Sequence, residues 1–461
     1  MKRIIKLLTL IMATTLLFTF TACGGGGKDD STTEIPYGKE EGKITFYVAG
    51  GTVELALWDN LIAEFEKQNE KIDVEPILFQ DYDTIYQSLA AGNAADVIQV
   101  ANGYAGNWAK AGMIKPLTQF INKDNFDTKV YWEQLISMFS YNSKTKTRGD
   151  GDLYALPKDF GVLGVYVNLD VINSSIQKGL ITQADKAKLL DKATPLTFEE
   201  YRDLAVKLTV KSGTGVSQYG TNSIYAESYM WNNGTDLIND EYKLNVGDEK
   251  LYEVYDYIYE MTDKSSPYFC APSLADTQSQ DDASMFLSGK IAMYWAGRWG
   301  APTWDAARMN YTCIPIPVVE KGQTPLSYAV SAGYAISKNC KNNGMAWEFV
   351  KFLGSETAYR ILNKLNYAVP GIKSLIYDEE FLTPIANTTM TREDIELFFT
   401  TATNARRACG DYFTSNRWTD ILTANLTGYY SGEYDTIDQC FKAMQTQVNA
   451  AIKKSDPSLF N

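Results

Sequence analysis

Between residues 44 and 100 the sequence alternates strand-like runs with helix-like patterns. Residues 44–49, 72–79 and 96–100 are rich in β-branched and aromatic side chains, which strands favour. Residues 58–65 place apolar side chains along one helix face, and residues 82–92 favour a second helix. Strands that alternate with helices need crossover connections. We therefore expect a largely parallel sheet covered by helices on both faces.

The same pattern resumes after residue 160 in a chain long enough for more than one lobe. Residues 163–167 form another strand-like run, and Thr197 with Glu200 has the spacing of a capping box at a helix start. Residues 346–353 repeat the helical spacing. With 461 residues, 45% of them hydrophobic, the chain can bury a sizeable core.

Residues 1–22 have the composition of an export signal. Lys2, Arg3 and Lys6 precede an apolar run over residues 7–20, which is shorter than the roughly 20 residues that a permanent membrane-spanning helix needs. Residues 20–23, Phe-Thr-Ala-Cys, resemble the lipobox of bacterial lipoproteins, in which the cysteine becomes the lipid-modified first residue. The resemblance implies a lipid on Cys23.

The composition of the next segment indicates a tether. Residues 24–27 are all glycine and are followed by small polar and charged residues. This composition is typical of flexible linkers, so we expect a linker over residues 23–41. A lipid on Cys23 would then hold a folded body at the extracellular face of the cell membrane.

The composition argues against several classes of function. The chain has 43 Lys and Arg against 56 Asp and Glu, a net charge of −13, which disfavours nucleic-acid binding. It contains no histidine, the usual general base and the commonest metal ligand, so we expect no metal site and no cofactor. The cysteines after residue 23 are odd in number and not closely spaced, which argues against a disulfide framework. They are Cys270, Cys313, Cys340, Cys409 and Cys440.

Seven segments, taken in order, carry a family resemblance. They are residues 65–69, 91–98, 111–117, 153–157, 195–201, 286–299 and 346–350. Together they resemble the family-1 extracellular solute-binding proteins of ABC importers, of the carbohydrate-binding, maltose-binding-protein-like type. The resemblance implies an α/β fold of two lobes, each a mostly parallel sheet flanked by helices, with a hinge between them.

The same resemblance implies where the lobes begin and end. Lobe 1 would comprise residues 42–157 and 296–365, and lobe 2 residues 158–295 and 366–461. The chain would cross between the lobes near Pro157, near Trp295 and near Val369.

Residues 286–304, FLSGKIAMYWAGRWGAPTW, contain the first candidate binding residues. An aromatic face can cover the C–H face of a sugar ring, and adjacent glycine lets the backbone approach a ligand. Arg298 can donate several hydrogen bonds in a fixed fork. We predict Trp295, Arg298 and Trp299 as ligand contacts and Trp304 as core, although each tryptophan could equally pack beneath a lobe boundary.

Other candidates lie in loops and at strand ends. Aromatic residues beside amides, in what reads as a loop, suggest Tyr229, Trp231 and Asn232, with a solvent-exposed turn as the alternative. Open α/β sheets bind ligands at the carboxyl ends of their strands. Strand ends, the first crossing and the family's small-residue loop add Gly51, Gln80, Asp81, Asn102, Tyr104, Asp159, Phe160 and Ser331. We expect Asp96, at a strand start, to be structural.

These features predict a lipid-anchored, monomeric substrate-binding protein rather than an enzyme. It would capture a carbohydrate, such as an oligosaccharide, between its lobes and deliver it to the transmembrane subunits of an ABC permease. One alternative is the same fold binding a peptide, a polyamine or a metal chelate. Another is a secreted glycoside hydrolase, because that chemistry needs only two carboxylates, for which Glu199-Glu200 and Asp281-Asp282 are candidate pairs.

Overall fold

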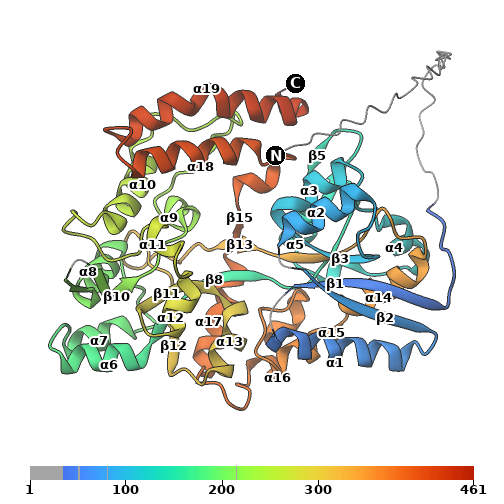
Figure 1. Ribbon diagram of the computed structural model, residues 1–461, viewed down its shortest axis with the longest axis horizontal. Helices are drawn as coiled ribbons and strands as arrows, with labels where there is room; N and C mark the ends of the chain where they lie inside the picture. The colour runs from blue at the N-terminus through green and yellow to red at the C-terminus, as the bar shows by residue number, and fades with distance from the viewer. Residues whose placement is uncertain (1–34, 50–51, 80, 214, 461) are drawn as a thin grey trace, which may run out of the picture. The chain divides into compact units, whose positions relative to one another are not determined.

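The computed structural model describes residues 35–49, 52–79, 81–213 and 215–460, which form two lobes built on separate sheets (Figure 1). The predicted export signal, the lipobox cysteine Cys23 and the glycine run lie outside the described residues. Within the described residues, no helix has the length and apolar character that crossing a membrane requires.

The sheet of lobe 1 contains the strands expected from the first part of the sequence. Its order is β2-β1-β3-β14-β7. Strand β1 (Gly42–Ala49) pairs in parallel with β2 (Ile72–Phe79) and β3 (Val97–Ala101), which confirms the three predicted strands. Strands β14 (Ala332–Ile336) and β7 (Leu156–Pro157) join antiparallel. Asp96 is structural as expected, because its Oδ2 accepts hydrogen bonds from Thr45 N and Oγ1 at 3.0 and 2.9 Å.

Helices cover this sheet and bury an aromatic core. The rings of Phe46 and Trp58 meet edge to face at 5.4 Å, and those of Phe46 and Phe349 at 5.1 Å. The helices of lobe 1 are α1 (Thr52–Gln68), α2 (Tyr82–Ala91), α3 (Asn102–Lys110), α4 (Thr118–Asp124), α5 (Glu133–Met138), α14 (Asn343–Leu353) and α15 (Glu356–Asn363). A small antiparallel sheet, β5-β4-β6, comprises β4 (Ser140–Asn142), β5 (Thr147–Arg148) and β6 (Asp152–Leu153).

The sheet of lobe 2 is built around strand β8 (Gly161–Asn168), which is buried along its whole length. The order is β15-β13-β8-β11-β10-β9, and β12 also pairs with β8. The other strands are β9 (Val210–Ser212), β10 (Gly215–Thr221), β11 (Ile291–Gly297), β12 (Tyr311–Ile314), β13 (Tyr328–Val330) and β15 (Arg406–Arg407).

Both sheets are mixed, so the prediction of mostly parallel sheets is wrong. In lobe 2 the pairs β10–β11 and β13–β15 are parallel, whereas β11, β12 and β13 all run antiparallel to β8. The reason lies in the connections. Strands β8 and β14 continue the chain from the other lobe and therefore enter each sheet in the opposite sense to the strands that follow helices.

The strand pairing also corrects one predicted crossing. The chain passes from β7 in the first sheet to β8 in the second over residues 158–160, which agrees with the predicted crossing near Pro157. Strands β11, β12 and β13 all remain in the second sheet, so the chain does not return to lobe 1 near Trp295. It returns between β13 and β14, at Ser331. Residues 296–330 therefore belong to lobe 2, whereas the family resemblance had implied a crossing near Trp295.

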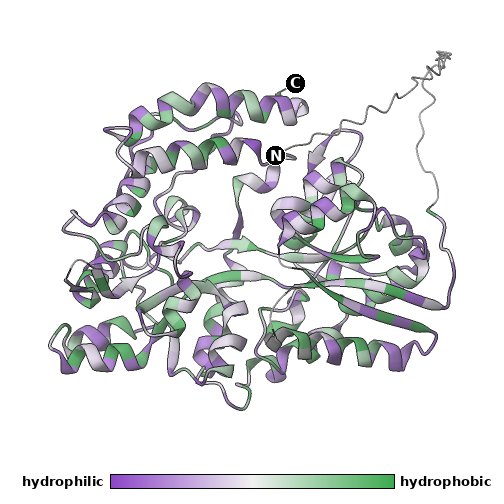
Figure 2. Ribbon diagram, in the orientation of Figure 1, coloured by the Kyte–Doolittle hydropathy of each residue, from purple (hydrophilic) through white to green (hydrophobic). Residues whose placement is uncertain are grey.

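Helices enclose the second sheet on both faces. Thr197 and Glu200 form the predicted capping box at the start of α8 (Phe198–Leu208). Figure 2 shows hydrophobic residues concentrated along the strands, with hydrophilic residues alternating along the surrounding helices. Longer helices are α6 (Leu169–Gln177), α10 (Glu249–Thr262), α17 (Arg392–Thr403), α18 (Arg417–Tyr430) and α19 (Ile437–Ser455); shorter ones include α9 (Ala226–Asn232), α12 (Asp282–Leu287) and α13 (Ala301–Ala306).

The end of the predicted linker is docked on lobe 1. Asn343 Nδ2 donates to the carbonyl of Pro36, and Gly344 N donates to that of Tyr37, both at 2.6 Å. The ring of Tyr37 packs against Phe120. The segment from Pro36 onward is therefore held against lobe 1, by backbone carbonyls and by the ring of Tyr37.

Candidate functional site

The carboxyl ends of the lobe 1 strands present an aromatic pair. Tyr104, in the first turn of α3, stacks on Tyr82 of α2 with ring centroids 5.3 Å apart and planes at 26°. Both side chains are partly exposed. Burial raises the pKa of Tyr82 to about 12. Asp81 is exposed, and its Oδ1 accepts hydrogen bonds from Thr84 N and Oγ1, so it caps α2. The predicted residues Gly51 and Gln80 lie outside the described residues.

Asn102, at the same edge, joins the two lobes instead of facing solvent. Its Nδ2 donates to both carboxylate oxygens of Asp411 at 2.8 Å, and its Oδ1 accepts from Ser331 N at 3.1 Å. The residue is only 5% exposed. All its polar atoms are thus engaged within the protein, so its predicted role as a ligand contact is replaced by a structural one.

A buried arginine completes this interlobe contact. Arg148 Nη2 lies 3.8 Å from Asp411 Oδ1 and donates to the carbonyl oxygens of Asn102 and Met138. Asp411 belongs to the short helix η4 (Cys409–Tyr412), and burial raises the pKa of its carboxyl, while Arg148 opposes that rise. We call Asn102, Arg148 and Asp411 the interlobe cluster.

The first crossing contains a second buried ion pair. Lys158 Nζ lies 3.7 Å from Asp159 Oδ2 and donates to the hydroxyl of Tyr367 at 2.5 Å. Ser331 Oγ donates to the carbonyl of Asp159 at 2.7 Å, which ties the two crossings together. Phe160 is fully buried and packs on a neighbouring tryptophan ring. The predicted residues Asp159, Phe160 and Ser331 therefore lie where the chain crosses between the lobes, and Phe160 is buried away from any ligand.

Trp299 is the predicted residue whose surroundings best suit a ligand platform. It is partly exposed and lies in η2 (Arg298–Gly300), directly after β11. A Cβ added at Gly297 would lie 1.8 Å from the Trp299 ring, and one added at Gly161 would lie 2.8 Å from it. The two glycines let the indole lie close against the ends of β11 and β8.

Two neighbours of Trp299 are interior side chains, which corrects their predicted role. Trp295 is 1% exposed, and its Nε1 donates to the hydroxyl of Tyr201. Arg298 is 2% exposed and donates to Asn366 Oδ1 and to the carbonyl of Ala368. Trp295 points into the core because side chains alternate along a strand. The guanidinium of Arg298 donates its hydrogen bonds to the turn at residues 366–368 and is therefore not free to bind a ligand.

The second predicted group is also interior. Tyr229, Trp231 and Asn232 lie in helix α9 and not in a loop, and all three are buried. The ring of Tyr229 stacks on Phe198 at 3.8 Å, and Trp231 Nε1 donates to Asp236 Oδ2. Asn232 Nδ2 donates to the carbonyl of Ser228. The polar groups of Trp231 and Asn232, which suggested ligand contacts, therefore form hydrogen bonds within the protein instead.

Sequence reasoning missed a line of partly exposed side chains in lobe 2, which we call the lobe 2 stripe. Tyr225 immediately precedes α9, whose first turn contains Glu227. The ring of Tyr328 is 6.4 Å from that of Tyr225, and the ring of Tyr294 stacks on Phe286 of α12, the helix that begins at Asp282. Residues 222–225 follow the carboxyl end of β10. The rule that ligands bind at the carboxyl ends of strands identified Asp81 and Tyr104 in lobe 1. Had β10 been recognised in the sequence, the same rule would have identified residues 222–225.

The stripe faces the junction of the lobes. The hydroxyl of Tyr328 interacts with the side chain of Asn102, which belongs to lobe 1. Burial raises the pKa of Glu227, and the charges of Asp236 and Asp411 raise it further. Tyr225, Glu227, Asp282, Tyr294, Tyr328 and Trp299 of lobe 2, with Tyr82 and Tyr104 of lobe 1, form the candidate site.

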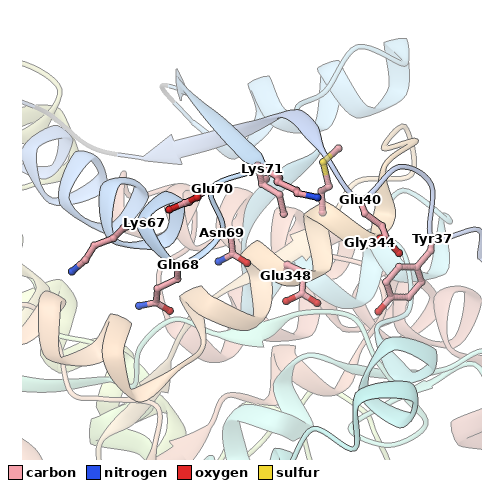
Figure 3. Close-up of a pocket in the computed structure, with 11 residues that line it drawn as sticks. Tyr37, Glu40, Lys67, Gln68, Asn69, Glu70, Lys71, Gly344 and Glu348 are labelled. Carbon is pink, nitrogen blue, oxygen red and sulfur yellow. The ribbon is translucent and has the colours of Figure 1, made fainter.

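A separate pocket on lobe 1 contains none of these residues. It has a volume of about 540 Å³ and lies between the end of α1 and the start of α14. Figure 3 shows that side chains of both charges line it, among them Lys67, Glu70 and Glu348. With cations and anions mixed and mostly exposed, this pocket shows no chemistry that would select a ligand.

Known proteins share both the sequence pattern and the fold. The family model described as bacterial extracellular solute-binding protein matches residues 49–360. The chain is 24% identical over 314 residues to the maltodextrin-binding protein MdxE of Bacillus subtilis, covering 67% of this chain and 69% of that protein. It is 23% identical over 344 residues to the galactooligosaccharide-binding protein of the same species, covering 70% and 74%.

A solved structure has the same arrangement of lobes. The ABC substrate-binding protein of Listeria monocytogenes in complex with cycloalternan superposes with a TM-score of 0.73 at 19% identity, covering 89% of this chain and 99% of that one. At this identity the similarity establishes the fold, which is the two-lobe α/β fold that the sequence predicts.

Proposed function

Because the chain belongs to the bacterial extracellular solute-binding proteins, we propose that it binds a carbohydrate between its two lobes and delivers it to an ABC permease. The relatives named for maltodextrin and galactooligosaccharide support a saccharide as the ligand. Their names also favour an oligosaccharide over a single sugar unit.

The aromatic side chains at the junction of the lobes carry this proposal. Lobe 1 contributes the stacked, partly exposed pair of Tyr82 and Tyr104, and lobe 2 contributes Trp299, Tyr225 and Tyr328. Aromatic rings cover the apolar faces of sugar rings, and the tyrosine hydroxyls can exchange hydrogen bonds with sugar hydroxyls. Rings on both lobes would let one ligand bridge them.

A ligand that bridges the lobes would stabilise the closed arrangement. Binding can shift a conformational equilibrium only by the difference in affinity for the two states. Contacts made by both lobes exist only when they are closed, so they supply that difference. The hinge built by Asp159 and Ser331 would bend while the sheets remain intact, and the permease would recognise the closed form.

One acid of each pair suggested for hydrolysis is engaged in structural contacts. Glu200 caps α8 and forms ion pairs with Lys188 and Lys321, and Asp281 caps α12. Glycoside hydrolysis needs two free carboxylates on either side of one bond. We therefore propose binding without cleavage, and incubation with maltotriose followed by an assay for new reducing ends checks it.

Isothermal titration tests the binding proposal. We expect one or more of maltotriose, maltohexaose and galactotriose to bind with a dissociation constant below about one millimolar. A saccharide at roughly 100 times its dissociation constant should stabilise the protein by about 2.7 kcal/mol, so a thermal-shift screen can precede titration. If no mono- or oligosaccharide binds at millimolar concentration, the assignment is wrong.

We also propose that Cys23 carries a lipid and holds a monomeric protein at the outer face of the membrane. The basic start, apolar run and lipobox-like residues 20–23 support the proposal, as does the extracellular location of the family. Expression in a bacterium fed radiolabelled palmitate should label the protein, and Cys23→Ala should abolish the label. Gel filtration with light scattering should give the mass of one chain; labelling of the Cys23→Ala variant would refute the anchor.

A further inference from the structure

Helix α3 connects the aromatic pair of lobe 1 with the interlobe cluster. Tyr104 lies in its first turn, and the centroid of the Tyr104 ring is 5.3 Å from that of Tyr82 and 5.8 Å from that of Trp108. Residues four apart share one face of a helix, whereas residues two apart lie on nearly opposite faces. Tyr104 and Trp108 therefore belong to one face of α3, and positions 102, 106 and 110 belong to the other.

The start of α3 is fixed by segments outside the helix. Ala101, at the N-cap position, makes no side-chain hydrogen bond to the helix. Asn102 is held instead by three other parts of the chain. Its backbone N donates to the carbonyl of Ser331 at 2.9 Å, its side chain donates to Asp411 at 2.8 Å, and its carbonyl accepts from Arg148 Nη2 at 2.6 Å. These contacts set the position of the first turn.

The same face of α3 is held at its middle and at its end. A Cβ added at Gly106 would lie 2.3 Å from Cδ of Arg148, so the arginine side chain lies directly against the helix there. In the last turn, Lys110 Nζ donates to Thr414 Oγ1 at 2.8 Å and to the carbonyl of Ser455 at 2.5 Å. The face opposite the aromatic rings is thus held along the length of the helix.

Part of this support comes from lobe 2. Asp411 and Thr414 flank Phe413, which is 1% exposed and belongs to the hydrophobic core of lobe 2. The segment also follows β15, a strand of the lobe 2 sheet. Because these residues are fixed to lobe 2, separation of the lobes would remove their contacts from α3.

We propose that Asp411 and Thr414 of lobe 2 position the ring of Tyr104 through helix α3, so that contact between the lobes fixes the aromatic pair in its ligand-binding position. This inference rests on the proposed function and adds positioning residues that do not themselves touch the ligand. A platform fixed before binding loses less conformational freedom when the ligand arrives. Contact between the lobes and binding of the ligand would then favour the same arrangement.

A double-mutant cycle tests the inference by isothermal titration with whichever of maltotriose, maltohexaose and galactotriose the native protein binds most tightly. Asp411→Asn keeps one oxygen that can accept from Asn102 but loses the second acceptor and the charge. We expect this change to weaken binding about fivefold or more when Tyr104 is present, and less than about twofold in the Tyr104→Ala background. A merely structural role would give the same ratio in both backgrounds, because the loss would not pass through the ring.

Lys110 offers a second variant that does not disturb the interior, because the residue is exposed. Lys110→Met removes both bonds at the end of α3 and should weaken binding about threefold or more, again only when the Tyr104 ring is present. Lys110→Arg keeps a charged donor and should bind like the native protein. As a matched control, Lys144→Met makes the same change at an exposed lysine in the β4–β5 turn and should leave binding unchanged.

The cycle with Lys110→Met decides the question if Asp411→Asn does not fold. Equal losses with and without the Tyr104 ring, or native affinity in both Asp411→Asn and Lys110→Met, would overturn the inference while sugar binding stands. Absence of binding by every saccharide would overturn the proposed function and this inference with it.

Discussion

Two glycines make room for the ring of Trp299 at a partly exposed position, where a tryptophan would otherwise be expected in the core. Its ring lies against Gly297 and Gly161, where no side chain could fit, and it stays partly exposed. Trp295, two residues before Gly297 on the same strand, is instead 1% exposed and lies within the core. The two residues thus offer a matched pair in which one ring is available to a ligand and the other supports the core.

We predict that Trp299→Ala weakens saccharide binding at least tenfold, about 1.4 kcal/mol, and leaves the protein folded. In the proposed site the ring would supply contact area to the ligand, and it packs at the edge of the core, where it stays partly exposed. Trp295→Ala should instead lower the free energy of unfolding by about 3–5 kcal/mol, because it creates a cavity in the core. Titration measures the first effect and urea denaturation the second. Loss of folded protein in Trp299→Ala would place that ring in the core as well.

Glu227 should make the protein less stable at neutral pH. Its folded-state pKa is raised above the ordinary 4.5, chiefly by burial. The cost of its charge is therefore absent below pH 4.5, grows as the pH rises toward the folded pKa, and is fully present above that value. Glu227→Gln should raise the melting temperature at pH 7 and leave it unchanged at pH 4, as calorimetry can measure. An increase of equal size at both pH values would rule out the charge as the cause.

Helix α8 illustrates an element whose start is specified locally. Thr197 Oγ1 accepts from Glu200 N, and Glu200 Oε2 accepts from Thr197 N, so two helix-end amides gain partners. The helix also buries Phe198, Tyr201 and Leu204 against the second sheet. The cap fixes where the helix begins, and the apolar face fixes where it packs.

Thr197→Ala should therefore destabilise the protein by about 1 kcal/mol, the usual effect of losing an N-cap side chain. Thr194→Ala, a change in the exposed loop just before the cap, is the matched control and should have no measurable effect. Chemical denaturation of both variants gives the comparison. Equal stability of the two variants would show that the cap makes no net contribution.

At the scale of the whole molecule, the interlobe cluster connects elements that are far apart in the sequence. Asn102 follows the third strand of lobe 1, Arg148 lies in a small hairpin, and Asp411 lies 309 residues beyond Asn102. All three are buried. Such a cluster is sensitive to the loss of one member, because a charge then remains buried without its partner.

Asp411→Ala should lower the free energy of unfolding by about 3–5 kcal/mol, because the buried guanidinium of Arg148 loses its counter-charge. The double variant Arg148→Met, Asp411→Leu should recover part of that loss by removing both charges. Glu241→Ala, which breaks the exposed pair with Lys243, should have no measurable effect. Denaturant melts compare the variants. If Asp411→Ala is as stable as the native protein, the cluster does not hold the lobes together.

The sequence by itself determined the local elements of this protein and its family. Strands β1, β2 and β3, helix α2 and the capping box of α8 all follow from side-chain periodicity and local hydrogen bonding, which neighbouring residues decide. The order of segments along the chain indicated the two-lobe fold, and the strand-end rule led to Tyr104. These features depend on contacts between residues close in sequence or on strand order.

Only the tertiary structure decided which polar and aromatic side chains remain free to contact a ligand. Trp295, Arg298 and Asn232 look like binding residues in sequence, but partners at Tyr201, Asn366 and Ser228 satisfy their polar atoms. Glu227 and Asp282 look like ordinary helix-start acids, yet burial raises the pKa of both carboxyls. Availability depends on what the rest of the chain brings to each side chain, and those partners come from distant strands and turns.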